Sequence, residues 1–571
     1  MSITTAGLTP APTEHLLDDV RLAVLTHTPG AGVGWSFDGG VLEVGSEGEL
    51  EIRLSVPLGD AVGFWHPDCR WERTLRPDWA GLAHASLVRG AVAGCLYDNS
   101  GESMLAFLAE DPVPETVMRF GVSEENRTFV VHLSIPAGCS PYRLLVEPRA
   151  GSVATAMRAL RGRLGLELAP VPEDARVPVY STWYGFAQNV TAASVEAEAA
   201  LAVEAGCGAL IMDDGWQRFG NGRGYAGVGD WVPDETKFPD FAGHVAKVRG
   251  LGLTYLLWVA PLLLGPEAEC FDDLAPFAPL AGPPGSRVLD PRRPEVRAHV
   301  VALCAGLVAD YGLDGLKIDF LNDAMVYAGQ PGEGLDVADV GTAMRLLLDE
   351  LRARLGPRAL IELRQPYIGP GMAGYGEMLR ADDCPADATA NRVQTVDAGL
   401  LAVRGAVHGD MLMWDEAATP VSAARQLIAS LHAVPQISAR LTRLDAEHRE
   451  MVAFWLGQWR RLRHLLLDGE VEPGRPDEFY PVIVAARDGE CVITVSAERV
   501  VPLGVAQRTT LINATSAHRL VLDIDGGPRS LRTRIFDARG RIIDRSELRL
   551  EPGLCALEVP PSGLAILEGS P

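Results

Sequence analysis

Acidic side chains, interleaved with tryptophan and tyrosine, recur in short polar segments that each follow an apolar run. The segments are Ser181-Thr-Trp183-Tyr184, Asp213-Asp214-Gly215-Trp216, Gly229-Asp230-Trp231, Lys317-Ile-Asp319, Glu362-Leu-Arg364, Arg380-Ala-Asp382-Asp383-Cys-Pro-Ala-Asp387 and His408-Gly-Asp410. Carboxylates accept hydrogen bonds from hydroxyl groups, and aromatic rings pack against apolar CH faces. Cleavage of a glycosidic bond requires two carboxyl groups that flank the bond. This combination of residues therefore indicates chemistry on carbohydrates.

Two of these carboxylates have charged neighbours that predict different ionisation states. Lys317 stands two residues before Asp319 on an expected strand, so both side chains point to one face and the lysine charge should lower the pKa of Asp319. Asp383 stands near Asp382 and Asp387, whose negative charges should raise its pKa. We interpret Asp319 as a nucleophile and Asp383 as a general acid and base. On the sequence alone, Lys317 and Asp319 could equally form a plain strand ion pair.

The other candidate residues also have a structural interpretation. An Asp-Asp-Gly sequence is more often a turn than a binding site, Arg380 could simply anchor the acidic cluster, and a single tryptophan is usually part of a core. The tryptophans concerned are Trp183, Trp216, Trp231, Trp258 and Trp414. Their gathering at expected strand ends favours the functional interpretation.

The elements that would position these residues alternate between short apolar runs and helical patterns. The expected strands are 177–182, 209–213, 253–260, 315–319, 359–363, 378–381, 406–410 and 434–438. Helical periodicity lies between them, as in 295–311, where Pro294 and Gly312 mark the ends. Eight strand-helix alternations predict a (β/α)8 TIM barrel with its site at the carboxyl ends of the strands. A doubly wound open sheet is the alternative, but no glycine-rich phosphate turn follows the first strand.

The regions on either side of the barrel have the spacing of β-domains. Short apolar or alternating runs, broken by Gly, Pro and Asp, fill the chain before residue 150 and after residue 470. We therefore predict an α/β protein with an N-terminal β-sandwich domain at 1–172 and a (β/α)8 barrel at 173–468. A C-terminal antiparallel β-domain, also a sandwich, is predicted at 469–571.

The composition of the chain disfavours some classes of binding partner. The 571 residues contain 51 Lys and Arg against 75 Asp and Glu, a formal charge of −24, which disfavours nucleic acid and anionic membranes as partners. The nine cysteines form no Cys-x-x-Cys pair, as is typical of reduced thiols, and no signal peptide or membrane-spanning run is recognisable. We therefore expect a cytoplasmic protein that acts on an oligosaccharide or glycoside without a metal or cofactor. Homo-oligomer formation stays open.

Four segments in one order match a known pattern. They are Ile-Met-Asp213-Asp214-Gly-Trp216-Gln, Gly-Asp230-Trp231 followed by Lys237-Phe-Pro, Gly315-Leu-Lys317-Ile-Asp319, and Asp383-x-x-x-Asp387. Together they resemble the α-galactosidase (melibiase) glycoside hydrolases, with family 36 as the closest match and family 27 and the raffinose-synthase-type enzymes as relatives. The resemblance also implies the barrel with a β-domain on each side.

This resemblance implies a retaining double displacement without metal or cofactor. Asp319 would be the nucleophile and Asp383 the acid/base, although the sequence does not decide among Asp382, Asp383 and Asp387. The resemblance and the strand-end positions together give a candidate substrate-binding set, which consists of Asp213, Asp214, Trp216, Trp231, Lys317, Arg364, Arg380, Asp387 and Trp183.

Four places depart from the family pattern. Family members usually place Asn two residues after the nucleophile, where this chain has Leu321. A Trp-x-Glu-Pro-Glu pattern is replaced by Trp258-Val-Ala-Pro261-Leu, and a Cys- and Gly-rich segment by Glu362-Leu-Arg364. The acid/base segment has one extra residue. The changes leave three functions open, namely α-galactoside hydrolysis, sugar transfer of the raffinose-synthase type, and sugar binding without catalysis.

Residues 64–79 combine aromatic and charged side chains in a way that is unusual for the surface of a β-sandwich. They include Trp65, His66, Arg70, Trp71 and Trp79. The segment is interpreted either as a rim that reaches over the barrel mouth or as a packed domain interface.

Overall fold

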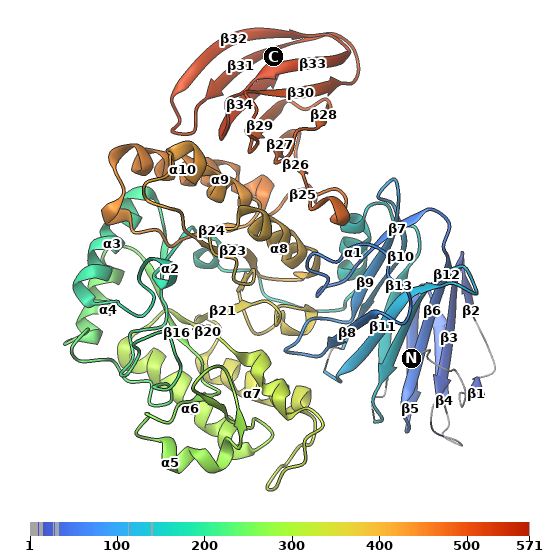
Figure 1. The fold of residues 1–571 in the computed structure, drawn as a ribbon, viewed down its shortest axis with the longest axis vertical. Helices are drawn as coiled ribbons and strands as arrows, with labels where there is room; N and C mark the ends of the chain where they lie inside the picture. The colour runs from blue at the N-terminus through green and yellow to red at the C-terminus, as the bar shows by residue number, and fades with distance from the viewer. Residues whose placement is uncertain are drawn as a thin grey trace.

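The computed structural model describes residues 9–10, 15–26, 28, 33–111, 113–138 and 141–569. Figure 1 shows three regions: two blue N-terminal sheets beside the barrel, the barrel in green to orange, and the red C-terminal sheets beyond α10. The predicted fold class, a TIM barrel between two β-domains, is confirmed.

The N-terminal region packs two sheets face to face. One sheet contains β1 (Thr9–Pro10), β2 (His15–Leu17), β3 (Val20–Thr26), β6 (Leu50–Pro57), β12 (Thr128–Ile135), β11 (Thr116–Ser123) and β8 (Gly81–Ala85). The other contains β4 (Val33–Asp38), β5 (Val41–Ser46), β13 (Tyr142–Glu147), β10 (Ser103–Ala109), β9 (Ala93–Asp98) and β7 (Ala61–Trp65). Buried residues such as Ile52, Leu54 and Phe107 form one apolar core between the sheets, as in a β-sandwich. Helix α1 (Val153–Gly162) follows.

The barrel is closed by parallel pairing between its last and first strands. Its strands in order are β14 (Val179–Ser181), β15 (Ala209–Met212), β16 (Thr254–Val259), β20 (Gly315–Ile318), β21 (Leu360–Arg364), β22 (Met378–Arg380), β23 (Ala406–Leu412) and β24 (Val434–Ile437). These are the eight predicted strands, within two residues at each end. The closed barrel excludes the open doubly wound sheet.

The helices alternate with these strands and cover the barrel. They are α2 (Trp183–Phe186), α3 (Ala192–Ala205), α4 (Phe241–Gly250), α5 (Phe271–Leu274), α6 (Pro294–Tyr311), α7 (Val340–Leu355), α8 (Ala388–Leu401), α9 (Pro420–Ala429) and α10 (Ala446–Leu466). The ends of α6 follow from its sequence, because Pro294 stands in the first turn and Gly312 closes the helix with a φ of 63°. Three two-residue strands, β17 (Leu263–Leu264), β18 (Leu280–Ala281) and β19 (Arg287–Val288), form a small sheet between α4 and α6.

The C-terminal region is a second pair of sheets. The larger contains β25 (Glu470–Glu472), β26 (Val482–Arg487), β27 (Glu490–Val495), β29 (Arg508–Asn513), β34 (Gly563–Gly569), β31 (Arg529–Phe536) and β32 (Ile542–Leu550), and the smaller contains β28 (Val500–Leu503), β30 (Arg519–Ile524) and β33 (Gly553–Glu558). Neighbouring strands are antiparallel except at β27–β29 and β28–β30, which are parallel. The sheets enclose an apolar core of their own.

The expected domain limits fall in connections between elements. Helix α1 ends at residue 162, β14 begins at 179, α10 ends at 466 and β25 begins at 470. We propose the limits 1–172, 173–468 and 469–571 on this basis. None of the helices in the described ranges combines the length and apolar character that a membrane crossing requires.

Candidate active site

The carboxyl ends of the barrel strands bring together most of the residues that the sequence singled out. Asp213 and Asp214 follow β15, Asp319 follows β20, and Asp382 and Asp383 follow β22. Because the strands are parallel in one closed barrel, these segments share one face although they lie far apart in the sequence.

Asp319 is held by three side chains. Its Oδ1 accepts hydrogen bonds from Arg364 Nε at 2.6 Å and from the Tyr367 hydroxyl at 3.1 Å, and its Oδ2 accepts one from Trp258 Nε1 at 3.0 Å. Phe320 has a φ of 59°, and this left-handed turn lets its backbone N–H donate to Asp319 Oδ1 at 2.8 Å. The side chain of Asp319 is only 11% exposed. The carboxylate is therefore fixed before any ligand binds.

The pKa of Asp319 is lowered, as expected, but its main cause was not anticipated. Burial by itself would raise the pKa, and the positive charges of Arg364 and then Lys317 outweigh burial and hold it well below its usual value. Lys317 does not form the plain strand pair with Asp319. Its Nζ donates to Asp213 Oδ2 at 2.6 Å and lies 4.0 Å from Glu362 Oε1. Asp319 is thus an ionised carboxylate beside two cations.

Asp214 is bound by two amides in the loops around it. Gln188 Nε2 donates to its Oδ2 at 2.7 Å and Gln217 Nε2 donates to its Oδ1 at 2.6 Å. Burial raises the pKa of Asp214 to about 6, although the two amides act in the opposite direction. Near neutral pH the Asp214 carboxylate can therefore accept hydrogen bonds, and Asp213 is paired with Lys317, so both side chains of the Asp-Asp-Gly segment have defined partners.

Asp383 is the open carboxylate of the site. Its side chain is 53% exposed, and its Oδ1 lies 2.9 Å from Arg380 Nη1. Burial of its surroundings raises the pKa of Asp383, but the charges of Arg380, Lys317 and Arg364 outweigh that effect and lower it. The expectation that neighbouring aspartates raise this pKa is therefore wrong for the ligand-free site, because sequence neighbours matter less than the arginine in contact.

The two aspartates next to Asp383 have different contacts. Asp382 Oδ1 accepts a hydrogen bond from Arg364 Nη1 at 3.2 Å, so one guanidinium contacts both Asp319 and Asp382. Asp387 is the N-cap of α8, and its Oδ1 accepts the backbone N–H of Ala390 at 2.9 Å. The structure thus gives Asp387 a local role in starting a helix.

Two of the three tryptophans in the candidate binding set are buried in the core at the strand ends, and one is half-buried. Trp216 is fully buried and donates from Nε1 to the Trp258 carbonyl oxygen at 2.9 Å, so the core interpretation applies to it. Trp231 is also buried, with its ring edge-on to Trp258 at 5.6 Å between centroids. Trp183 is half-buried, and the Arg223 guanidinium lies 5.8 Å from its ring centroid. Of the three tryptophans in the candidate binding set, only Trp183 has appreciable accessible surface.

The candidate binding set left out Glu362 and Asp410, although the strand-end segments that contain them were singled out in the sequence. Arg380 Nη1 contacts Asp410 Oδ1 at 2.5 Å, and Asp410 Oδ2 accepts hydrogen bonds from the Tyr184 hydroxyl and the Cys384 backbone. Arg380 Nε also lies 3.7 Å from Glu362 Oε1. Glu362 and Asp410 stand at predicted strand ends, so position alone could have identified them. Arg380 therefore anchors the acidic cluster and also contacts the proposed acid/base.

The segment 64–79 contributes mainly to an interface between domains. Trp65 Nε1 donates to Asp397 Oδ1 on α8 at 2.9 Å, and Arg73 pairs with the same carboxylate at 2.5 Å. Arg70 reaches further and lies 3.9 Å from Asp382 Oδ2, beside a hollow of about 240 Å³ that Gln365 also lines. The segment is chiefly a packed interface, with one residue at the rim of the site.

The described residues hold no group of three or more His, Cys, Asp or Glu side chains arranged to bind a metal ion. The side chains gathered at the site carry carboxylates, guanidinium groups, an amine and aromatic rings. The closed (β/α)8 barrel, with a cluster of carboxylates at the carboxyl ends of its strands, places this chain among the TIM-barrel proteins, which build their sites at that face.

Comparison with known proteins makes this class more specific. No protein-family profile matches the chain. The chain is 30% identical to the α-galactosidase of Escherichia coli over 196 residues, which cover 33% of this chain and 27% of that protein. It is 28% identical to α-galactosidase AgaA of Geobacillus stearothermophilus over 130 residues, 21% of this chain and 17% of that protein. The matched part thus spans about a quarter or less of the length of these curated relatives.

Solved structures extend the likeness to almost the whole chain. The family 36 α-galactosidase AgaA of Geobacillus stearothermophilus has a TM-score of 0.65 at 15% identity, covering 99% of this chain and 87% of that one. The α-galactosidase of Lactobacillus brevis has a TM-score of 0.63 at 15% identity, covering 99% and 86%. The resemblance to family 36 α-galactosidases is therefore confirmed: part of the sequence is similar to theirs, and the fold is the same.

Proposed function

We propose that this chain is a retaining glycoside hydrolase that cleaves terminal α-galactosidic bonds by double displacement. The observation that carries the proposal is Asp319, an ionised and rigidly held carboxylate at the end of β20, on the same face of the barrel as a half-exposed carboxylate after β22. The α-galactosidase relatives support the choice of substrate.

In the first displacement, Asp319 attacks the anomeric carbon while the glycosidic oxygen takes a proton from Asp383 and leaves. Oδ1 of Asp319 already accepts three hydrogen bonds and Oδ2 accepts one, so Oδ2 has the freer lone pairs and is the attacking oxygen. In the second, the Asp383 carboxylate takes a proton from water, and the resulting oxygen attacks the anomeric carbon and releases Asp319.

Asp383 must hold a proton in the first step, and substrate binding would provide for this. A sugar ring above a half-exposed carboxylate removes water from it, and loss of water raises the pKa of an acid. The negative charge of Asp319 acts in the same direction on Asp383. The assignment rests on Asp383 because Asp382 is bound through Arg364 and Asp387 caps a helix.

The sugar itself would be bound by the buried polar groups around Asp319. Lys317 has three N–H donors and Asp213 uses one of them, which leaves donors for a hydroxyl near the anomeric carbon. Asp213 and Asp214 would accept hydrogen bonds from the hydroxyls that distinguish galactose. Trp183, Arg364 and Arg380 complete the proposed binding set.

Two other functions have some support. Arg364 contacts Asp319 directly and the pKa of Asp383 is low, so a sugar-binding protein with little catalysis is the second candidate. The 240 Å³ hollow beside Asp382 offers space for an acceptor sugar, which would suit transfer of the raffinose-synthase type. A cytoplasmic location remains a prediction from the single cysteines, and homo-oligomer formation remains open.

A panel of aryl α- and β-glycosides tests the proposal directly. We expect hydrolysis of p-nitrophenyl α-galactoside, release of α-galactose as the first product by proton NMR, and little turnover of β-galactosides or α-glucosides. First release of β-galactose would contradict the retaining mechanism. Galactose binding in calorimetry without turnover would establish the sugar-binding alternative, and product formation only with excess sugar acceptor would establish transfer.

A further inference from the structure

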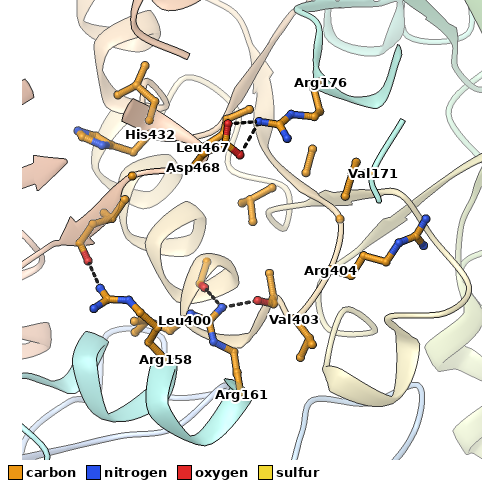
Figure 2. Close-up of a pocket in the computed structure, with 18 of the residues that line it drawn as sticks. Arg158, Arg161, Val171, Arg176, Leu400, Val403, Arg404, His432, Leu467 and Asp468 are labelled. Atoms are coloured by element: carbon orange, nitrogen blue, oxygen red, sulfur yellow. Dashed lines mark hydrogen bonds and ion pairs between the residues drawn. The ribbon is translucent and has the colours of Figure 1, made fainter. Parts of the chain in front are cut away.

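A cavity of about 510 Å³ is lined by residues from all three regions of the molecule, and none of the proposed active-site residues lines it. Figure 2 shows the residues that surround it. Its walls come from α1, the connection 166–176, the second half of α8 with the residues up to 407, His432, and residues 466–473. Ala406 begins β23, whereas Asp410 stands further along the same strand. The cavity therefore opens at the amino ends of the barrel strands, opposite the end that carries the carboxylates.

The charge of the cavity wall is opposite to that of the protein. The whole chain has 75 acidic residues and 51 basic ones, but four arginines and a single aspartate line this cavity. Figure 2 shows Arg158, Arg161, Arg176 and Arg404 approaching from different sides. Carboxylates, three of them outside the lining, pair with Arg158, Arg176 and Arg404, and the pair of Arg404 is Glu377 at 3.5 Å, so the unbalanced positive charge of the wall lies on Arg161.

Arg161 is the cation that lacks a negative partner. Arg176 is bound by both oxygens of Asp468 at 2.6 Å, and Arg158 pairs with Glu470 and Glu472 at 2.9 and 3.2 Å. Arg161 instead donates to two backbone carbonyls at the end of α8, those of Gly399 and Ala402. Within the described residues it has no carboxylate within ion-pair distance.

The pKa of Arg161 is lowered by this environment. Burial, and then the charge of Arg158, lower the pKa of Arg161 to about 10. The guanidinium still carries its charge at neutral pH. An anion bound beside it would relieve both effects.

The rest of the wall is apolar. Val171, Leu400, Val403 and Leu467 face the space between the arginines (Figure 2). The volume falls within the range of about 300–1,000 Å³ that is usual for small-molecule sites. A ligand that fits these walls needs an anionic group at one end and an apolar body.

We propose that this cavity binds a small organic anion, with a carboxylate or phosphate group against Arg161 and an apolar body against Leu400, Val403 and Val171. Because its walls belong to all three regions of the molecule, the ligand holds these regions together. Binding should therefore raise the unfolding temperature of the whole chain.

The test uses the full chain with four matched probes and inorganic phosphate. In isothermal titration calorimetry and thermal unfolding, we expect octanoate or octyl phosphate to bind and to raise Tm. Octylamine and octanol should bind at least tenfold more weakly, because they have the same chain without the negative charge. The tighter of the two anions identifies the headgroup. Equal binding of octylamine, binding of inorganic phosphate alone, or no binding of either anion would overturn the proposal.

Variants locate the site. Arg161→Met should weaken binding of the better anion at least tenfold, while Arg163→Met, on the same helix end but paired with Glu147 away from the cavity, should not. Since Arg161 also holds two carbonyls, Val403→Trp provides a second variant that fills the cavity and keeps the arginine. It should abolish binding, and retained affinity in both Arg161→Met and Val403→Trp would place the anion elsewhere. None of these readouts depends on glycosidase activity.

Discussion

The two sides of the proposed active site differ in how firmly their carboxylates are held. Asp319, after β20, accepts hydrogen bonds from three side chains and is 11% exposed. Asp383, after β22, contacts one arginine and is 53% exposed. A nucleophile can be positioned in advance, since its ionised state needs no ligand. A general acid must gain a proton, and here that state depends on what covers Asp383.

Each of the two carboxylates also shares an arginine with a second aspartate. Arg364 joins Asp319 to Asp382, and Arg380 joins Asp383 to Asp410. The charge of Arg364 lowers the pKa of Asp319, and the charge of Arg380 lowers the pKa of Asp383. That is favourable for a nucleophile and unfavourable for an acid, so variants on the two sides should differ in size of effect and in pH dependence.

The largest effect is expected for Asp319, the rigidly held carboxylate. Asp319→Asn keeps the shape of the side chain but removes the nucleophile, and kcat on p-nitrophenyl α-galactoside should fall by a factor on the order of 10⁴–10⁶. In Asp319→Ala, added azide should restore cleavage because it fits the space of the missing carboxylate and forms a glycosyl azide. Circular dichroism checks that both variants are folded. Activity within tenfold of the wild type in a folded variant would remove Asp319 from the mechanism.

The second-largest effect is expected for Asp383, the half-exposed carboxylate. Asp383→Ala should reduce kcat/KM on melibiose by about 10²–10⁴, because its leaving group needs a proton. The same variant should lose far less on p-nitrophenyl α-galactoside, whose leaving group departs without one. Asp382→Ala is the matched control from the same loop and should not show this dependence on the leaving group. If Asp382→Ala shows it and Asp383→Ala does not, the acid/base is Asp382.

Arg364 links the two sides and acts as a positioning residue. In Arg364→Ala, the loss of fixed geometry should lower kcat by about 10². The pKa of Asp319 should rise, because burial is then opposed only by Lys317 and weaker contributions. The acid limb of kcat/KM should therefore move to higher pH, and Arg364→Lys should return it part of the way. A loss of activity with an unchanged acid limb would mean that Arg364 has a purely structural role.

The pH dependence of the wild-type protein tests the protonation of Asp383 without any substitution. Asp383 must be protonated, and in the free enzyme its pKa lies below its ordinary value of 3.8. Since the protonated fraction decreases as pH rises above the pKa, kcat/KM should decrease about tenfold for each pH unit on the alkaline side. The alkaline limb of kcat should lie at higher pH, because bound substrate shields Asp383 from water. Coincident alkaline limbs for kcat and kcat/KM would contradict this effect of substrate.

The same contrast explains what the sequence could predict. Strand positions followed from apolar runs, and the Lys317-x-Asp319 spacing was enough to place a cation near Asp319 and to predict the direction of its pKa shift. The partner of that cation was not predictable, because Lys317 pairs with Asp213, more than a hundred residues away in the sequence. Only the closed barrel brings the two together.

On the acid side, sequence neighbours were a poor guide. The pKa of Asp383 was expected to rise because Asp382 and Asp387 stand close in the chain, yet those side chains bind Arg364 and the start of α8 instead. Arg380 was expected as an anchor of the acidic cluster or as a binding residue, but the spacing did not show that its charge would outweigh burial and lower the pKa of Asp383. In a loop, each side chain can turn to a different partner, so spacing does not determine contact.

The smallest effect should come from Asp387, which belongs to the acid-side loop by sequence and to the scaffold by structure. Its Oδ1 caps α8 by accepting the Ala390 N–H at 2.9 Å, and loss of an N-cap costs about 1 kcal/mol. Asp387→Ala should therefore lower the free energy of unfolding by about that amount in urea titration while kcat/KM stays within twofold. Asp387→Ser keeps a capping oxygen and should recover most of the stability. A large fall in kcat/KM in both variants, with stability preserved in the serine variant, would instead mean that Asp387 contacts the substrate, as its place in the sequence first suggested.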